Sequence, residues 1–161
     1  MTKREAGFSY TVFETSDDLS EKDAELVSRA REFTKTAYAP YSKFRVAAAA
    51  RMENGKIVCG TNQENASFPV GICAERVLLS TISSIYPDEQ IETIAVTYEP
   101  ENGISDQPAS PCGLCRQTLL EYEQRQEKPI RILLAGMEGE IYLLDTVSHL
   151  LPLGFGKENL K

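Results

Sequence analysis

Two cysteines, Cys112 and Cys115, stand three positions apart in the segment PCGLCRQ, which covers residues 111–117. This spacing is typical of a pair of metal ligands or of a redox-active dithiol, and it also arises by coincidence. A third ligand elsewhere in the chain would favour the metal. The chain has 161 residues and four cysteines, so the remaining candidates are Cys59 and Cys73.

Cys73 is the better candidate because it stands, like Cys112, at the start of a predicted helix. Helix N-termini favour thiolates, since unpaired N–H groups and the helix dipole lower the pKa of a thiol. In an α/β sheet two such helix starts can converge at the carboxyl edge of adjacent strands. Three thiolates and an open fourth position would make a catalytic zinc site.

Cys59 and Glu75 each leave an alternative open. Cys59 as a fourth ligand would make a closed structural site, but its context KIVCG predicts a strand, where a free cysteine packs as a small apolar residue. Glu75 follows Cys73 by two residues, so in the first helical turn its carboxylate can lean over the metal and move protons. A helix N-terminus also favours glutamate without any chemistry.

Composition restricts the partners of the chain. The net charge of −7 disfavours nucleic acid polymers, and no apolar run approaches the ~20 residues that span a bilayer. The N-terminal segment lacks the apolar core of a secretory signal, so we expect a cytoplasmic protein with free thiols or metal ligands. The single histidine, His149, excludes histidine-rich metal sites, and we interpret it as a solvated or capping residue.

Hydrophobic periodicity predicts a three-layer α/β domain around a mixed sheet. Ser20 is predicted to cap a helix that ends near Pro40, and Asn54-Gly55 is a strong hairpin signal between two strands. The alanines at 47–50 predict close packing of a helix on the sheet. The other expected elements are helices that begin near residues 73 and 112 and strands at 91–99, 129–136 and 140–145. The alternation of Phe8, Tyr10 and Val12 also fits a strand at 8–14.

Several segments together resemble the small homotetrameric cytidine deaminases of pyrimidine salvage, over roughly residues 21–161. They are AYAPYSKFRV, TNQENASFPVGICAER, SPCGLCRQ and LLPLGFG. CAE followed by PCGLC also matches the zinc nucleobase deaminase signature with cysteine in the histidine position. The resemblance implies a three-layer α/β/α cytidine deaminase-like fold with a central mixed five-stranded sheet at 21–161, and residues 1–20 as an extension with an extra strand.

The resemblance also implies a reaction. One Zn²⁺ per chain, held by Cys73, Cys112 and Cys115, would activate a water that attacks C4 of cytidine or 2′-deoxycytidine, releasing ammonia. Glu75 would pass the water proton to N3 and help protonate the departing amino group. Zn²⁺ with three thiolates carries a surplus negative charge, which Arg76 would offset by hydrogen bonds to the sulfurs.

Substrate contacts follow from the same resemblance. Asn62 and Glu64 would bind the ribose 3′-hydroxyl, which favours a nucleoside over a nucleotide. Phe44 would pack near the pyrimidine, while the backbones of Ala74 and Ser110 would read the base edge and the leaving amine. Phe155 would reach the active site of a neighbouring subunit in the homotetramer. For both phenylalanines, core packing remains an alternative.

The chain departs from the family pattern in two places, with Ala47 where glycine is usual and a longer segment before residue 111. Two other functions remain open at this point. One is deamination of another aminopyrimidine nucleoside, such as a nucleoside antibiotic, and the other is a zinc-stabilised interaction module without turnover. Glu75 argues against the second, because a purely structural zinc site has no use for a proton carrier.

Overall fold

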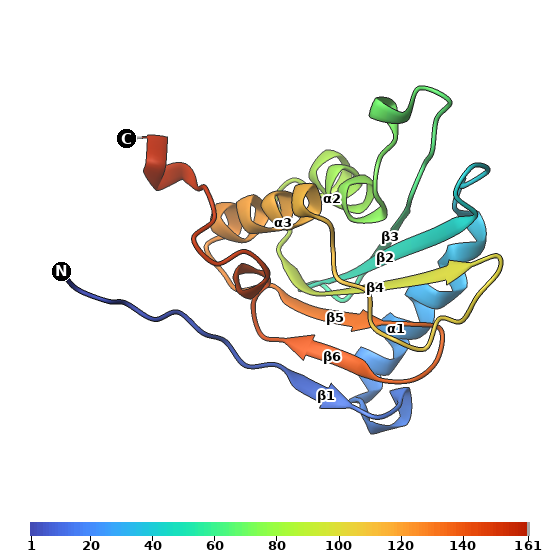
Figure 1. Ribbon diagram of the computed structural model, residues 1–161, viewed down its shortest axis with the longest axis horizontal. Helices are drawn as coiled ribbons and strands as arrows, with labels where there is room; N and C mark the ends of the chain where they lie inside the picture. Colours follow the sequence, from blue (N-terminus) through green and yellow to red (C-terminus); the bar gives the residue numbers. More distant parts are fainter. Residues whose placement is uncertain (161) are drawn as a thin grey trace.

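A computed structural model, which describes residues 1–160, has a sheet between two helical layers (Figure 1). One helix covers one face and two helices cover the other, which confirms the predicted three-layer α/β/α fold. None of the helices within residues 1–160 could cross a bilayer. The helices are α1 (Glu21–Phe33), α2 (Ala74–Ile85) and α3 (Gly113–Gln126); the strands are β1 (Thr11–Phe13), β2 (Phe44–Met52), β3 (Ile57–Thr61), β4 (Ile91–Pro100), β5 (Arg131–Ala135) and β6 (Ile141–Leu144).

The sheet is mixed and has the strand order β1-β6-β5-β4-β2-β3. Only β4 and β5 are parallel; the other neighbours are antiparallel, including the predicted β2–β3 hairpin and the β5–β6 pair. The sheet therefore has six strands rather than five. The sixth is β1, the extra N-terminal strand expected from the sequence, which pairs with β6 and forms one edge of the sheet.

The N-terminal segment is held by stacked rings as well as by strand pairing. Tyr10 lies 4.9 Å from Tyr142 of β6, and Phe8 stacks on His149 with ring centroids 5.4 Å apart. His149 is thus half-buried beneath an aromatic ring. The expectation of a solvated His149 is therefore corrected, because Phe8, just before β1, covers one face of its ring.

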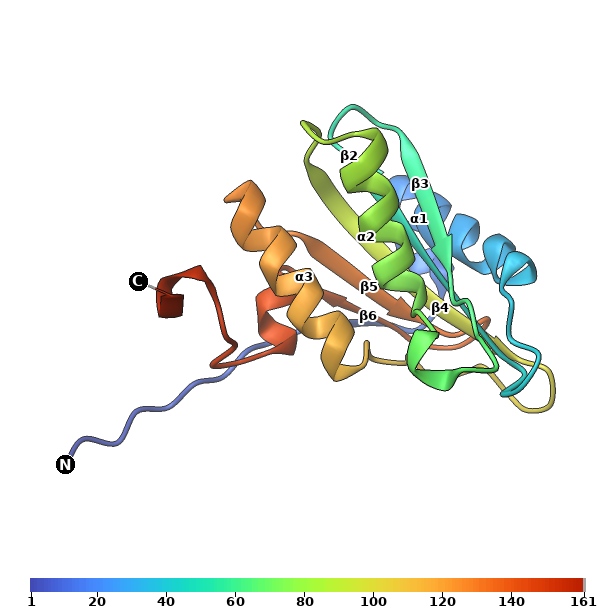
Figure 2. The same ribbon diagram turned by 90° about the horizontal axis from the view of Figure 1, so that it is seen from above.

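Small residues in β2 let helices pack closely on both faces of the sheet. Ala47, Ala48, Ala49 and Ala50 are all 0% exposed. Ala48 and Ala50 pack with α2 and α3, whereas Ala49 packs with α1, as expected for side chains that alternate across a strand. Figure 2 shows α2 and α3 side by side on their shared face.

Helix α1 begins as predicted but ends earlier than predicted. The Ser20 side chain accepts a hydrogen bond from the backbone of Asp23 and caps the helix. The helix ends at Phe33 and not near Pro40. The hydroxyl of Thr34 donates to the carbonyl of Arg31 (2.8 Å) and contacts the carboxylate of Glu99 (3.1 Å), and a 3₁₀ turn follows. Side chain–backbone bonds of this kind compete with a continuing helix.

Gly60 of β3 sets the position of α2. A Cβ at residue 60 would collide with the backbone nitrogen of Leu78 and lie 2.8 Å from the carbonyl oxygen of Ala74. Both of those atoms belong to the backbone of α2 and cannot move as a flexible side chain can. The absence of a side chain at Gly60 therefore allows the first turns of α2 to rest directly on the sheet.

We predict that Gly60→Ala lowers the melting temperature by several degrees, because overpacking of a tight core typically costs about 1–3 kcal/mol. Gly7→Ala is the control, since a Cβ at residue 7 meets no described atom within 4 Å. Thermal unfolding of the two variants and the parent tests this. Equal melting temperatures for Gly60→Ala and the parent would show that α2 shifts freely on β3.

Candidate active site

Three thiols meet where α2 and α3 begin. Cys73 is the N-cap residue of α2, Cys112 is the N-cap residue of α3, and Cys115 lies in the first turn of α3. Their sulfur atoms all lie within 4.8 Å of one another, and Cys73 Sγ is 3.8 Å from Cys112 Sγ. The predicted convergence of two helix starts is confirmed. A third thiol at this distance favours a metal site over a simple dithiol.

Cys59 does not belong to this cluster. It packs with α1 on one face of the sheet, whereas α2 and α3 cover the other face. Burial raises the pKa of the Cys59 thiol, the direction expected for an apolar packing residue. The sheet itself separates Cys59 from the other three thiols, so Cys59 is not placed to act as a fourth metal ligand.

The thiols interact strongly with one another. A hydrogen bond from Cys115 lowers the pKa of Cys73 to about 6, with a smaller contribution from Cys112, and Arg76 acts in the same direction through its charge. The bond with Cys73 and burial raise the pKa of Cys115. Soft thiolate donors within one coordination sphere suit zinc, which takes its protein ligands deprotonated.

Glu75 lies beside the thiols and is only 4% exposed. Burial raises the pKa of its carboxyl, although its own backbone N–H and the Cys115 thiol oppose that shift by hydrogen bonding. A raised pKa is the direction expected for a carboxyl group that takes up and releases a proton during a reaction. A glutamate that served only to stabilise a helix N-terminus could remain exposed to solvent. The burial of Glu75 beside the thiols therefore favours a chemical role.

A cavity of about 220 Å³ opens onto Cys73, Cys112 and Glu75. This volume suits a small ring, and most of the wall is apolar. The cavity includes four residues that the resemblance assigned to the substrate and five that sequence reasoning missed. The four are Phe44, Asn62, Ala74 and Ser110; the five are Val46, Val96, Thr97, Tyr98 and Ala109.

One wall of the cavity is built from the ends of β2 and β4. Val46 and Tyr98 are register partners, and the rings of Phe44 and Tyr98 stack with centroids 5.0 Å apart and an interplanar angle of 17°. Strand alternation places Val46 on the same face as Phe44, a signal that could have identified it. The place of Tyr98 in the cavity wall could be predicted only from the register between β2 and β4, which the sequence does not reveal.

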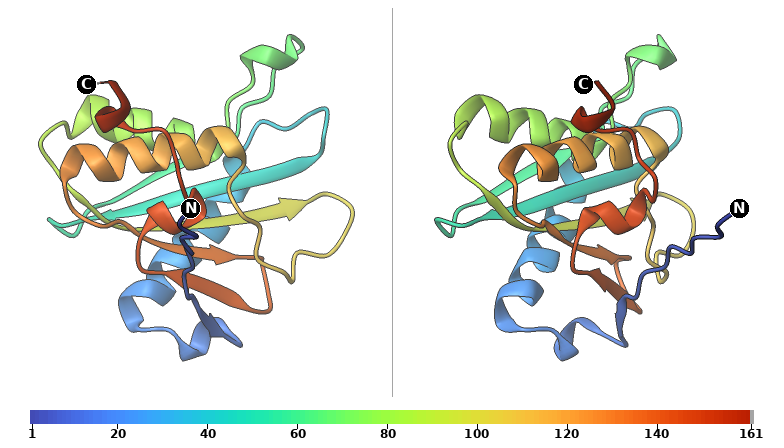
Figure 3. Two further views of the ribbon diagram at one scale, coloured as in Figure 1. Left: turned by 60° about the vertical axis from the view of Figure 1, so that its left-hand side comes forward. Right: turned by 90° about the vertical axis from the view of Figure 1, so that its left-hand side faces the viewer.

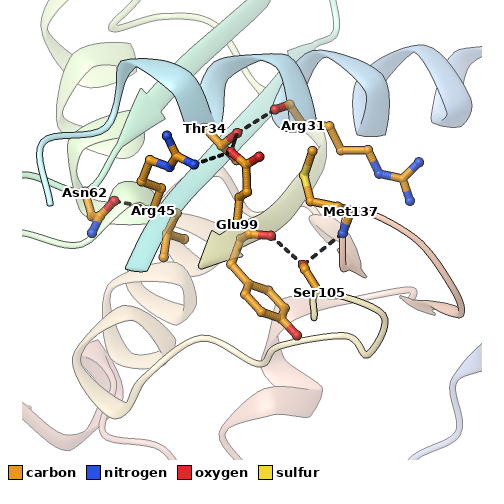
Figure 4. Close-up of polar contacts among 9 residues, drawn as sticks. Arg31, Thr34, Arg45, Asn62, Glu99, Ser105 and Met137 are labelled. Atoms are coloured by element: carbon orange, nitrogen blue, oxygen red, sulfur yellow. Dashed lines mark hydrogen bonds and ion pairs between the residues drawn. The ribbon is translucent and has the colours of Figure 1, made fainter. Parts of the chain in front are cut away.

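Polar contacts fix these strand ends (Figure 4). The carboxylate of Glu99 pairs with the guanidinium of Arg45 (3.1 Å) and contacts the hydroxyl of Thr34 (3.1 Å), which ties β4 to β2 and to the end of α1. Ser105 donates to the carbonyl of Tyr98 and accepts from the backbone N–H of Met137 (3.0 Å). The long segment before the PCGLC motif is therefore anchored at both β4 and the β5–β6 turn.

Asn62 holds the backbone of β2. Its side chain accepts from the N–H of Val46 (2.8 Å) and donates to the carbonyl of Phe44 (2.9 Å). Asn62 thus lines the cavity and also fixes Phe44, which forms part of the same wall. The expected contact with a ribose remains a prediction.

Three other residues named from the sequence lie outside the cavity lining. Glu64 lines a neighbouring depression with Tyr41 and Phe68, and hydrogen bonds from the Ser42 side chain and the Tyr41 backbone lower the pKa of its carboxyl. Arg76 is half-buried near Cys73. Phe155 lies in the C-terminal tail, residues 150–160. Its side chain is 58% exposed and covers no part of the cavity of its own chain.

Known proteins resemble this chain in sequence and in fold. A cytidine deaminase from Halalkalibacterium halodurans is 34% identical over 84% of this chain and 95% of its own length. A blasticidin-S deaminase from Bacillus cereus is 30% identical over 86% of this chain and 95% of its own. The crystal structure of a cytidine deaminase from Burkholderia pseudomallei matches with a TM-score of 0.71 and 33% identity, over 85% of this chain and 100% of that one.

The sequence model of the family described as the cytidine and deoxycytidylate deaminase zinc-binding region matches residues 20–127. That match covers more than half of the chain and includes the three clustered cysteines and Glu75. The thiol cluster, the buried carboxyl and the relatives agree, and the chain belongs to the cytidine and deoxycytidylate deaminase family.

Proposed function

We propose that the chain is a zinc-dependent cytidine deaminase, which converts cytidine and 2′-deoxycytidine with water into uridine and 2′-deoxyuridine with release of ammonia. One observation carries the proposal: three clustered thiols and a buried carboxyl share a cavity large enough for a small ring. Cys73, Cys112 and Cys115 would hold one Zn²⁺. When bound, the metal supplies an activated water for attack on C4 of the base.

Glu75 would handle the protons of this reaction. Its carboxylate takes the proton of the attacking water and delivers it to N3 of the base. The carboxylate would then take the proton of the hydroxyl group now bonded to C4 and pass it to the amino group, which leaves as ammonia while the C4 carbonyl of uridine forms. Glu75 is only 4% exposed, and burial raises the pKa of its carboxyl, the direction that such a role needs.

Other side chains would tune the site and select the substrate. Arg76 compensates the surplus charge of three thiolates on one Zn²⁺, in line with its effect on the pKa of Cys73. Phe44 packs against the pyrimidine, and the backbones of Ala74 and Ser110 bind the base edge and the leaving amine. Asn62 and Glu64 receive the ribose 3′-hydroxyl, and the negative charge of Glu64 disfavours a phosphate there.

A second substrate class is supported by one comparison. The relative from Bacillus cereus is named a blasticidin-S deaminase and matches most of this chain. Blasticidin S carries an aminopyrimidine, so the cavity would act on the same kind of ring. A substrate assay should therefore include both cytidine and blasticidin S, and the ratio of kcat/KM values assigns the preference.

We further propose a homotetramer with shared active sites, in the cytoplasm, acting in pyrimidine salvage. The exposed ring of Phe155 supports the shared site, because burial of such a ring is worth roughly 1.5–3 kcal/mol and its own chain does not bury it. The four free cysteines are compatible with a reducing compartment.

We predict that the purified protein converts cytidine to uridine, followed by the ultraviolet change of the base, and that Glu75→Gln abolishes most of this activity. Glutamine keeps the size and the hydrogen bonds of the side chain but cannot carry the proton. Loss of a general acid–base typically costs about 10²–10⁴-fold, and two transfers place the loss at the upper end or beyond. Zinc content, measured by elemental analysis, should stay the same.

Glu121→Gln is the matched control, because Glu121 is an exposed carboxylate on α3. Its kcat should equal that of the parent. A Glu75→Gln enzyme that retains most of its activity would contradict the proposed proton transfer. A parent protein that binds zinc but turns over neither cytidine nor blasticidin S would favour the interaction module instead.

A mixing experiment tests the shared site. Phe155→Ala should raise KM for cytidine and leave zinc content intact, because the tail closes over the substrate of a neighbouring subunit. Chains with an intact tail and Glu75→Gln, co-assembled with Phe155→Ala chains, should restore some active sites with the parental KM. With subunit exchange verified by mass, a mixture that shows no gain over Phe155→Ala alone would mean that the ring serves its own chain.

A further inference from the structure

The C-terminal tail lies along one face of α3. The side-chain amide of Gln117 donates to the carbonyl of Phe155 at 2.8 Å. Further along the helix, Gly154 lies against Leu120 and Gly156 lies against Gln124. Positions 117, 120 and 124 share one helical face, so the tail meets α3 at three successive positions along that face. Figure 3 shows the C-terminal segment beside α3.

The two glycines that flank Phe155 both lie close to side chains of α3. A Cβ at Gly154 would collide with Leu120 Cδ2, and a Cβ at Gly156 would lie 2.7 Å from the side-chain amide atoms of Gln124. Neither glycine has a positive φ. At both positions the backbone of the tail therefore lies close to side chains of α3.

The ring of Phe155 is directed outward as a result. With the backbone of residues 154 and 156 against the helix, the side chain between them remains 58% exposed. The carbonyl of the same residue is bonded to Gln117. The orientation of the ring therefore depends on the backbone of Phe155, which the side-chain amide of Gln117 holds against α3.

The start of the tail is tied to the PCGLC motif by Arg116. Its Nε donates to the carbonyl of Pro111 (2.7 Å), and its Nη1 donates to the carbonyl of Leu150 (3.3 Å). The two residues that follow Cys115 thus both bind the tail. Arg116 binds the tail at Leu150, next to the PCGLC motif, and Gln117 binds it at Phe155, which carries the exposed ring.

We propose that Gln117 is a positioning residue for Phe155. Its amide fixes the tail on α3 so that the ring stands where it can cover a nucleoside bound to a second copy of this chain. This inference rests on the proposed function, in which Phe155 closes a neighbouring site. Gln117 touches neither the cavity nor the thiols, so its effect is on substrate binding and is transmitted through the tail.

The kinetic test replaces Gln117 with methionine, which keeps the length and helix preference but cannot donate a hydrogen bond. One amide–carbonyl bond corresponds to roughly a two- to tenfold change in an equilibrium, so Gln117→Met should raise KM for cytidine by about that factor. The value of kcat and the zinc content should match the parent. Glu121→Met, exposed on the same helix, should change neither.

A double-mutant cycle tests whether Gln117 affects KM through Phe155. In a Phe155→Ala background, Gln117→Met should add nothing further to KM, because the ring that it positions is gone. If the KM increase of the double variant equals the product of the two single increases, Gln117 acts independently of Phe155 and the inference is wrong. A loss of zinc or a fall in kcat would also overturn it, since Gln117 would then support the helix that carries Cys115.

A spectroscopic test needs no turnover. The chain contains no tryptophan, so Phe155→Trp introduces a single reporter at the tail. Gln117→Met should lower the fluorescence anisotropy of this tryptophan and increase its quenching by acrylamide, and Glu121→Met should leave both unchanged. If Gln117→Met leaves both unchanged while Phe155→Ala still raises KM, the positioning role is wrong and the shared site stands. If Phe155→Ala does not alter KM, the shared site itself fails and the inference falls with it.

Discussion

The structure depends on one constraint: two helices must begin at the same edge of the sheet, with their N-termini a few ångströms apart. Cys73 and Cys112 are the capping residues of those helices, and Cys115 follows one turn into the second, so all three sulfurs lie within 4.8 Å. Helix N-termini offset the charge of thiolates, which would otherwise repel one another. The same juxtaposition places Glu75, in the first turn of α2, at the cavity beside them.

The rest of the fold serves this juxtaposition by permitting close approach. Alanines at 47–50 and the bare backbone of Gly60 let α2 pack tightly against the sheet. Glu99, Arg45 and Asn62 then fix the strand ends that form the opposite wall of the cavity. The C-terminal tail lies along another face of α3, where the side-chain amide of Gln117 donates to the carbonyl of Phe155. The metal site and the tail are therefore positioned by the two sides of one helix.

Local signals predicted the elements that carry the chemistry. The Ser20 cap, the Asn54-Gly55 hairpin and the two cysteine-capped helix starts depend on neighbours within a few residues, and the structure contains all of them. Long-range contacts were not predictable in the same way. Tyr98 joins the cavity through the register of β2 and β4, and the end of α1 depends on a contact with Glu99. The position of the C-terminal tail depends on contacts with α3, more than thirty residues earlier in the chain.

The central claim is an open site of three thiolates, and X-ray absorption at the zinc edge tests it directly. The zinc-loaded protein should show three sulfur neighbours at about 2.3 Å and one oxygen or nitrogen neighbour at about 2.0–2.2 Å. The lighter neighbour marks the position left for water and substrate. A shell of four sulfurs would contradict the account, because Cys59 would then have to leave the α1 face of the sheet and close the site as a structural centre.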